Sequence, residues 1–330
     1  MKLQDTGIGF DRGLDFFSLF RKYTTQYWVF AILNDDSSIA GMASVTRYRG
    51  KVKVNGISEE RWIGYLGDLR LSSTASHMAH KQWREVYAVI VKHLENPESE
   101  EYCDHLITAV FQENLRALQL FRTRLKTVKY HELCPYWNLS IFESWFSGRV
   151  NRDFQLCEVS AELLENRERP SLSFSTLPKD PSFRNLLIQN DDTKLGAQLF
   201  DARGARTLRV MNIPSLLRWG FRLISLFSSV RYSESMEWII QGLSALSWDQ
   251  AASFEQKEQS LLALIKAIFL ANKRNFHLLN ITFMDQKLCE AIQKRVPISK
   301  RTAGWLFEVT STEKSQSLQK ENLVFEGAFL

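Results

Sequence analysis

The sequence predicts a mixed α/β fold made of two copies of one unit, and three observations support this. The chain has 330 residues, which favours two domains over one, and 45% of them are apolar, as is typical of a globular protein. Segments with strand-like alternation are interspersed with segments of helical periodicity along the whole chain. Their order up to residue 146 recurs from Asn151 onward, which indicates an internal repeat.

The first unit is expected to contain a helix, antiparallel strands, a helix, a strand, a helix and final strands. A helix around "LDFFSLFRKY" precedes the strands "YWVFAIL" and "IAGMASVTRYRGKVKV", which a polar turn connects. The central strand "RWIGYLGDLRLS" is followed by a helix over residues 77–94, the strand "YCDHLITAVF" and a short helix that opens at Asn114. Final strands around "VKYHELCPYWNLSIF" complete the unit.

The second unit repeats this order with little sequence identity. "NLLIQNDDTKLGAQLFDARGARTLRV" corresponds to the first two strands and their Asp-rich turn, and "MEWIIQGLSALSW" corresponds to the central strand. "SFEQKEQSLLALIKAIFLANKR", "FHLLNITF" and "DQKLCEAIQKR" follow as helix, strand and helix. We therefore expect two domains, at residues 1–146 and 147–330.

Composition narrows the class of protein. No run of eighteen uncharged apolar residues occurs, and the start "MKLQDTGIGFDR" lacks the apolar core of a signal peptide, so a cytoplasmic protein is expected. The net charge of +5 suits an anionic ligand, but it is spread along the chain and gives little support to nucleic-acid binding. The four cysteines lack paired spacing, which predicts buried thiols rather than disulfides or a zinc site: Cys103, Cys134, Cys157 and Cys289.

Residues 54–121 resemble a known family. The segment "VNGISEERWIGYLGDLRLSS", a long helix and then "ITAVFQENLRALQLF" are similar to the GNAT superfamily of N-acetyltransferases, particularly its bacterial two-copy members. The superfamily's "N-x-R-A-x-x-L-[FY]" segment is matched by Asn114, Arg116, Ala117, Leu120 and Phe121. The resemblance implies two GNAT-like units, each with a sheet splayed between its fourth and fifth strands. It also implies acetyl-CoA or another acyl-CoA as donor and a small-molecule or peptide amine as acceptor.

The resemblance places the donor along the central strand and the turn after it. Backbone N–H groups of Leu69, Arg70 and Leu71 would polarise the thioester carbonyl, and Asn114 would contribute from the next helix. The superfamily's phosphate turn, "[QR]-x-x-G-x-[GA]", aligns with residues 76–81, where the arginine and both glycines are missing. Ala79 is small enough for the backbone to approach a ligand closely. The residues expected to contact the pyrophosphate are Ser76, His77, Ala79, His80 and Lys81.

The donor is expected in the first unit only. The corresponding turn of the second unit, "WDQAASFEQKEQ", has Glu255 and Glu258 in the first turns of its helix. Carboxylates there stabilise the helix but repel a pyrophosphate.

Asp68 is the candidate general base. Strand alternation places it on the same face as Arg70, near the expected thioester; the alternative is that both charges pair with neighbours on a partly exposed face. The tyrosine that the superfamily often uses as an acid is replaced by Phe121. Tyr130, or else Tyr136, is expected to replace it from the last strands, the alternative being that both pack as core aromatic residues.

Three further features have open interpretations. His77 and His80 are three residues apart, but no metal is expected because no carboxylate or cysteine lies at a matching spacing. The amphipathic segment 214–232 is expected to pack between the units, with a membrane surface or a partner as the alternative. The missing glycines and tyrosine also allow a non-catalytic protein that keeps the fold to bind a ligand or partner. The sequence does not indicate an oligomeric state.

Overall fold

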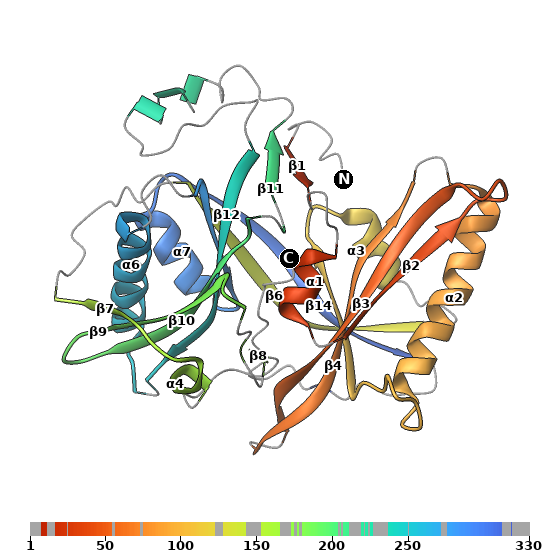
Figure 1. The fold of residues 1–330 in the computed structure, drawn as a ribbon, viewed down its shortest axis with the longest axis horizontal. Coiled ribbons are helices and arrows are strands. Elements are labelled where there is room, and N and C mark those ends of the chain that lie inside the picture. Colours follow the sequence, from red (N-terminus) through yellow and green to blue (C-terminus); the bar gives the residue numbers. More distant parts are fainter. Residues whose placement is uncertain are drawn as a thin grey trace.

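The computed structural model shows one large mixed sheet with helices packed against it (Figure 1). The residues that the structure describes are 8–11, 17–24, 26–54, 57–72, 75–122, 128–142, 153–165, 173–174, 177, 180–203, 205, 207–210, 219–220, 222–223, 225–226, 237–249, 251–271, 276–311 and 318.

The first half of the sheet has the predicted order of elements. A hairpin of two antiparallel strands pairs with the long central strand, and a helix then crosses over to a parallel strand. Such a crossover needs a long connection, which the helix provides. The elements are β1 (Ile8–Asp11), α1 (Ser18–Tyr23), β2 (Gln26–Leu33), β3 (Ile39–Val54), β4 (Ile57–Leu71), α2 (His77–Glu95), β5 (His105–Phe111), α3 (Leu115–Arg122) and β6 (Val128–Ile141).

The second half has the same order: a hairpin, a central strand, a long helix, a parallel strand, a short helix and a long last strand. Its elements are β7 (Gln155–Glu158), α4 (Ala161–Glu165), β8 (Ser173–Phe174), β9 (Phe183–Gln189), β10 (Lys194–Asp201), β11 (Thr207–Val210), β12 (Glu237–Trp248), α6 (Phe254–Ala271), β13 (Leu278–Phe283), α7 (Gln286–Arg295) and β14 (Ser299–Ser311). The predicted mixed α/β fold with two equivalent halves is confirmed.

The two halves exchange their last strands. The strand order is β2-β3-β4-β5-β14-β6-β13-β12-β10-β9-β7, so β14 completes the first half beside β5, and β6 completes the second half beside β13. β6 and β14 also pair with each other along almost their whole length, from Val128 with Ser311 to Ile141 with Ser299. The halves therefore do not have separate sheets. The predicted boundary at residue 146 lies outside the described residues and stays a prediction.

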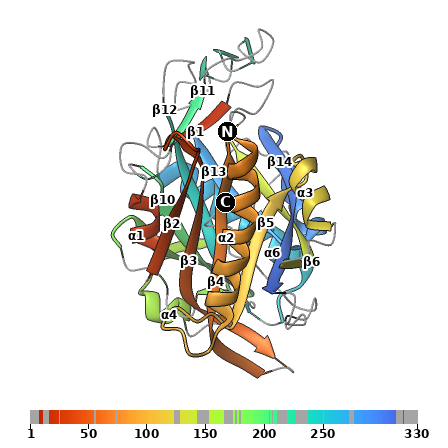
Figure 2. The same cartoon turned by 90° about the vertical axis from the view of Figure 1, so that its right-hand side faces the viewer.

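Three clusters of buried apolar side chains pack on this sheet. One lies between α2 and the first half (Figure 2), and one lies between α6, α7 and the second half. The third contains side chains of both halves, including Tyr65 of β4 and Phe200 of β10. Tyr65 and its neighbour Leu66 belong to different clusters, because successive strand residues point to opposite faces. The cluster that contains Tyr65 and Phe200 therefore joins the two halves through buried side chains, and a separate cluster covers the opposite face of β4.

The exchanged strands approach each other closely at Gly304. A Cβ added to Gly304 would lie 2.3 Å from Cζ and from the hydroxyl oxygen of Tyr136, which faces it across the β6–β14 pair. Tyr136 is completely buried, and burial raises its pKa. The side chain of Tyr136 thus fills the space that the glycine leaves.

The cysteines agree only in part with the prediction. All four are free thiols, and Cys103 and Cys289 are buried, with burial raising the pKa of Cys289 to about 12. Cys134 is half-buried and Cys157 is exposed, so the prediction of four buried thiols is wrong for these two. Cys157 lies on the short strand β7, which is the last strand of the sheet and has a neighbouring strand on one side only among the described residues.

Candidate functional site

The central strands of the first half separate, as predicted. Only residues Ile63–Tyr65 of β4 pair with β5, at its residues His105–Ile107. Beyond this pairing, β4 continues to Leu71 and β5 continues to Phe111. In the second half β12 and β13 pair over residues 240–243 and 278–281, and β12 continues to Trp248. Each half therefore has a gap in the sheet between its two parallel strands.

A β-bulge interrupts β4 at this point. Gly67 pairs with Ser44 and Arg70 pairs with Met42, so Asp68 and Leu69 both stand opposite the single residue Ala43. A bulge leaves backbone groups outside the ladder of hydrogen bonds. The strand thus offers backbone groups beside the gap, as the predicted role of Leu69 requires.

β12 carries an equivalent bulge. Ser244 pairs with Gln198 and Ser247 pairs with Gly196. Ala245 and Leu246 therefore both stand opposite the single residue Ala197. Ala245 has a φ of 52°, an uncommon backbone conformation for a residue other than glycine. The bulge of the second half contains no carboxylate, whereas that of the first half contains Asp68.

The bulge also removes the argument that placed the candidate base Asp68 on the same face of the strand as Arg70. The prediction that Asp68 and Arg70 share a face rests on strict alternation, and alternation does not hold across a bulge. The side chains of Asp68 and Leu69 lie outside the described residues, and Arg70 is exposed. The role of Asp68 as a base stays a prediction.

A small apolar cavity lies between α2 and the separating strands. Its volume is about 20 Å³, roughly the space that one water molecule needs. The hydroxyl of Thr108 on β5 donates to the carbonyl of Leu66 on β4 at 2.7 Å, where the two strands begin to separate. The lining includes Leu66, Gly67, Trp83, Tyr87, Thr108 and Phe121.

Two tyrosines form a buried pair beside this cavity. The hydroxyl groups of Tyr87 and Tyr130 are hydrogen-bonded, and Tyr130 stacks on Phe121. Burial raises the pKa of Tyr130 to about 12, and the pKa of Tyr87 also lies well above its ordinary value because of burial and the contact with Tyr130. Both phenols therefore carry their protons at neutral pH. Sequence reasoning missed Tyr87, although its spacing of four from Trp83 places both on the apolar face of α2.

The turn before α2 uses several of its own N–H groups. The N–H of Ala79 donates to the hydroxyl of Ser76, the N–H of Ser76 donates to Oδ1 of Asn34, and the N–H of Ala75 donates to the carbonyl of Ser72. Ser76 is thus the N-cap of α2. His77 and Met78, in the same turn, have N–H groups with no hydrogen-bond partner among the described residues, and these lie at the positive end of the helix dipole.

The other predicted phosphate residues differ in exposure. His77 and Lys81 are exposed and His80 is half-buried, so these side chains are accessible. Ala79 is only 1% exposed and packs in the cluster beneath α2, since the third residue of the helix turns toward the sheet. Within the described part of the chain, no three or more histidine, cysteine or acidic side chains are grouped to hold a metal.

Asn114 has a structural role. Its side-chain oxygen accepts a hydrogen bond from the N–H of Ala117 at 3.2 Å, and its carbonyl accepts from the N–H of Leu118. It therefore caps α3 from an exposed position. A contact between Asn114 and a donor stays a prediction.

The corresponding helix start of the second half has a similar cap but carries a carboxylate. Ser253 and Gln256 cap each other's N–H groups through their side chains, at 2.7 Å and 3.2 Å, which forms a capping box. Glu255 adds a negative charge in the first turn of α6. The carboxylate disfavours an anion at α6, and binding of a donor in the first half stays a prediction.

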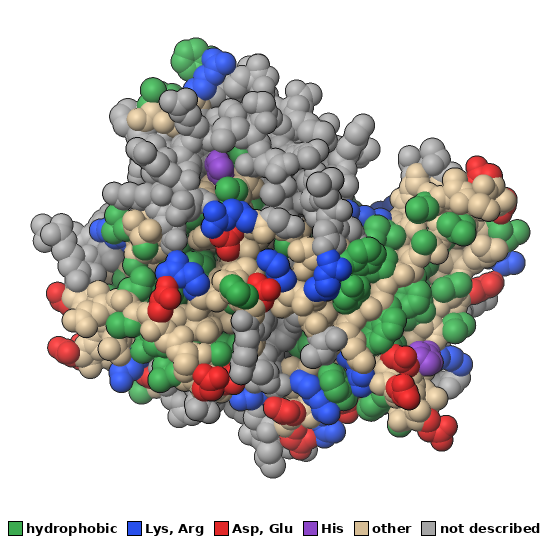
Figure 3. All heavy atoms as spheres, viewed as in Figure 1, with side chains coloured by type: hydrophobic (Ala, Val, Ile, Leu, Met, Phe, Trp, Pro, Cys, Tyr) green, Lys and Arg blue, Asp and Glu red, His purple; other side chains and the backbone are tan. Residues whose placement is uncertain are grey.

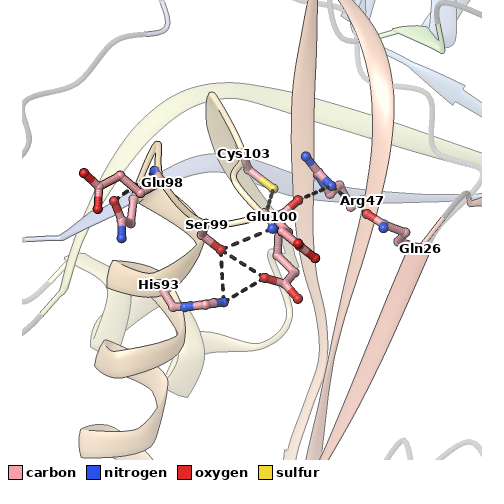
Figure 4. Close-up of polar contacts among 9 residues, drawn as sticks. Gln26, Arg47, His93, Glu98, Ser99, Glu100 and Cys103 are labelled. Carbon is pink, nitrogen blue, oxygen red and sulfur yellow. Dashed lines mark hydrogen bonds and ion pairs between the residues drawn. The ribbon is translucent and has the colours of Figure 1, made fainter.

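The far end of α2 is held by a polar network (Figure 4). Nε2 of His93 lies 3.1 Å from Ser99 Oγ and from Glu101 Oε2, and the hydrogen bond from Ser99 lowers the pKa of Glu101. Arg47 on β3 donates to the carbonyl of Glu100 at 2.9 Å and also to Gln26 on β2. The network connects the loop after α2 to the first two strands of the sheet.

Comparison with known proteins shows the fold. No protein-family model and no curated protein matches the sequence. A crystal structure of Saccharomyces cerevisiae N-myristoyltransferase with bound myristoyl-CoA is similar over 98% of this chain and 83% of its own, with a TM-score of 0.53 and 9% identity. A second, with bound myristoyl-CoA and inhibitors, has a TM-score of 0.55 at 9% identity and is similar over 98% of this chain and 80% of its own.

At this level of identity the likeness concerns the fold alone. It extends over nearly the whole chain, both halves included, and agrees with the splayed parallel strands and the repeated order of elements. The predicted GNAT-like fold is therefore confirmed, and the two equivalent halves are compatible with the fold of N-myristoyltransferase.

Proposed function

We propose that the protein is an acyl-CoA-dependent N-acyltransferase whose donor binds in the first half. The observation that carries this proposal is the convergence of three features at one place. β4 separates from β5, β4 bulges at Asp68 and Leu69, and the protonated pair Tyr87 and Tyr130 lies beside the gap. The likeness to a structure with bound myristoyl-CoA supports the same class of donor.

The proposed reaction forms a C–N bond and breaks the C–S bond of the thioester. Backbone N–H groups at the bulge would stabilise the oxyanion that develops when the amine attacks, because preorganised donors need no rearrangement. Asp68 would accept the proton that the amine loses. Tyr130, with Tyr87 as its hydrogen-bond partner, would give a proton to the departing thiolate. The products are an amide and free CoA.

The donor's pyrophosphate would bind at the start of α2. The free N–H groups of His77 and Met78 and the nearby side chains of His80 and Lys81 provide hydrogen-bond donors and positive charge. We propose an amine, in a small molecule or a peptide, as the acceptor. Acetyl-CoA is the first donor to test, because the resemblance of residues 54–121 to the GNAT superfamily implies it.

A second candidate function is non-catalytic binding on the same fold. Two features of the turn before α2 favour it. The N–H groups of Ala75, Ser76 and Ala79 donate to hydrogen bonds within the protein, and the glycines and arginine of the GNAT motif are missing. A protein of this kind would keep the architecture without turning over a thioester.

Titration calorimetry with acetyl-CoA, followed by a thiol-release assay with a panel of primary amines, separates the two candidates. Binding with a stoichiometry near one, together with amine-dependent release of CoA, is expected. Binding without release from any of several acyl donors would favour the non-catalytic candidate. If no acyl-CoA binds at all, the proposal of a donor site in the first half is wrong.

A further inference from the structure

Part of the segment between β11 and β12 exposes an apolar helical face. The backbone is helical at residues 219–220, 222–223 and 225–226, and three large apolar side chains there face solvent: Trp219 is 65% exposed, Leu223 52% and Leu226 75%. Their spacing of four and then three places them on one side of a helix. The prediction that segment 214–232 packs between the two halves is therefore wrong for these residues.

The exposed face lies at the outer edge of the molecule. In Figures 1 and 2 the helical pieces, drawn in teal, lie beyond β11, away from the body of the sheet, and Figure 3 shows apolar and basic side chains together at this place. Arg222 is exposed between Trp219 and Leu223, and no ion-pair partner lies near it among the described residues. The face thus combines exposed apolar side chains with an exposed cation.

The sequence around this face has an unusual charge. Residues 202–233 contain no aspartate, glutamate or lysine, so their net charge is +6, whereas the whole chain has only +5. The net positive charge of the chain is therefore concentrated in this segment, which corrects the interpretation that it is spread along the chain. One of these cations, Arg203, pairs with the preceding Asp201. The basic residues are Arg203, Arg206, Arg209, Arg218, Arg222 and Arg231.

We propose that this face binds the surface of a membrane that contains anionic lipids. Trp219, Leu223 and Leu226 would enter the boundary between headgroups and acyl chains, while Arg222 would contact a lipid phosphate. No helix among the described residues is long and apolar enough to span a membrane, so the contact would be interfacial. The proposal does not depend on the proposed acyl transfer.

A membrane fits these residues better than a nucleic acid or a protein. A nucleic acid would neutralise the arginines but would leave leucine side chains in water, and no row of lysines accompanies them. A protein partner would need acidic groups matched to several arginines around an apolar centre. An anionic bilayer offers both the negative charge and the apolar layer over an area of any size.

Co-sedimentation of the full-length protein with vesicles tests the proposal. Vesicles of phosphatidylcholine alone are compared with vesicles of phosphatidylcholine and phosphatidylglycerol in a 3:1 ratio, at low and at high salt. We expect binding to the anionic vesicles that is at least tenfold stronger than to the neutral ones and that weakens with salt. The double variant Leu223→Ser and Leu226→Ser should lose at least tenfold in binding, and Arg222→Glu should lose the preference for anionic vesicles.

A matched control removes one leucine of similar exposure elsewhere. Leu270 on α6 is 53% exposed, so Leu270→Ser should leave vesicle binding unchanged. Melting temperatures of all variants should stay near that of the wild type, since each replaced side chain already faces water. Wild-type protein that stays in the supernatant with both kinds of vesicle would overturn the proposal. So would a loss of dimers, seen by light scattering, in the double variant without any change in vesicle binding, because the face would then be a contact between two copies.

Discussion

The rings of Phe121 and Tyr130 stack with their centroids 3.9 Å apart and their planes within 8° of parallel. Phe121 occupies the position at which the GNAT superfamily often has a tyrosine, and Tyr130 brings a hydroxyl to the same aromatic stack from β6. That hydroxyl is hydrogen-bonded to Tyr87 of α2, which lines the cavity. A phenol therefore lies beside the position of the missing one, on a residue that is nine positions away in sequence.

This stack predicts the effect of removing one oxygen atom. Tyr130→Phe keeps the ring and its packing, so the melting temperature should stay within a few degrees of that of the wild type. If Tyr130 protonates the thiolate, the rate of acyl transfer should fall about a hundredfold, the lower range for a general acid. Tyr102→Phe, at the far end of α2, serves as the control and should leave the rate unchanged. An unaltered rate in Tyr130→Phe would make Tyr130 a packing residue only.

The raised pKa of Tyr130 predicts sensitivity to alkali. The pKa is about 12 in the folded protein against 10.0 for an ordinary tyrosine, so the unfolded chain releases this proton first as pH rises. The resulting stability is fully present below pH 10 and is lost between about pH 10 and 12. Urea denaturation at pH 8 to 11.5 should show this decline. The decline should be shallower in Tyr130→Phe, and equal slopes in the two proteins would contradict the assignment.

The start of α2 allows a backbone N–H group to be removed without breaking the helix. His77 is the first helical residue after the cap, a position that tolerates proline, and Ser76 has φ and ψ of −64° and 158°, which suit a residue before proline. His77→Pro should therefore fold normally but bind acyl-CoA about tenfold more weakly, because a hydrogen bond to a charged phosphate is lost. His77→Ala is the control for the side chain. Equal calorimetric affinities of the proline and alanine variants would exclude this N–H group as a phosphate contact.

The fold was predictable because its signals are local. Periodicity in the sequence indicates the long helices and most of the longer strands, and their order repeats, so the two-half architecture was predicted from the chain alone. The strands β1, β7, β8 and β14 were not predicted. The exchange of β6 and β14 was not predictable, because nothing in the sequence of either strand indicates which parallel strand it joins. Pairing between residues so far apart in sequence is decided by the packing of the whole sheet.

The candidate site was predictable only in part. The splay and the position of the α2 turn agree with the prediction, but Ala79 faces the core and would not be a clean probe of ligand binding. A tryptophan there would disrupt the cluster beneath α2 whatever the ligand does. The bulge at Asp68 was missed because a bulge adds one residue to a strand without changing its composition.

Asp68 remains the residue to test as the base. Asp68→Asn keeps the shape and some hydrogen bonding while it removes the basicity, so we expect a loss of about a hundredfold or more in acyl-transfer rate with a near-normal melting temperature. Asp192→Asn, at an exposed turn of the second half, is a control for the change of charge. A large drop in melting temperature, with activity in proportion to the folded fraction, would instead identify Asp68 as a structural ion-pair partner.

Because β14 pairs with both β5 and β6, we predict that its residue Gly304 contributes to the stability of both halves. Gly304 lies on β14 between β5 and β6, and an added Cβ would meet the ring of the buried Tyr136 at 2.3 Å. Gly304→Ala therefore forces the ring or the strand to move, which should cost about 1–3 kcal/mol of unfolding free energy, as overpacking usually does. Gly242→Ala on β12 is the matched control, because nothing lies within 4 Å of a Cβ added there.

Thermal unfolding followed by both near-UV and far-UV circular dichroism would measure the two variants. Because β14 completes the first half and belongs in sequence to the second, Gly304→Ala should lower one shared transition and not split it into two. Gly242→Ala should melt close to the wild type. If Gly304→Ala produced two separate transitions, the halves would unfold independently and the exchanged strands would not couple them. If both variants melted alike, the close approach of Tyr136 to β14 would not be a determinant of stability.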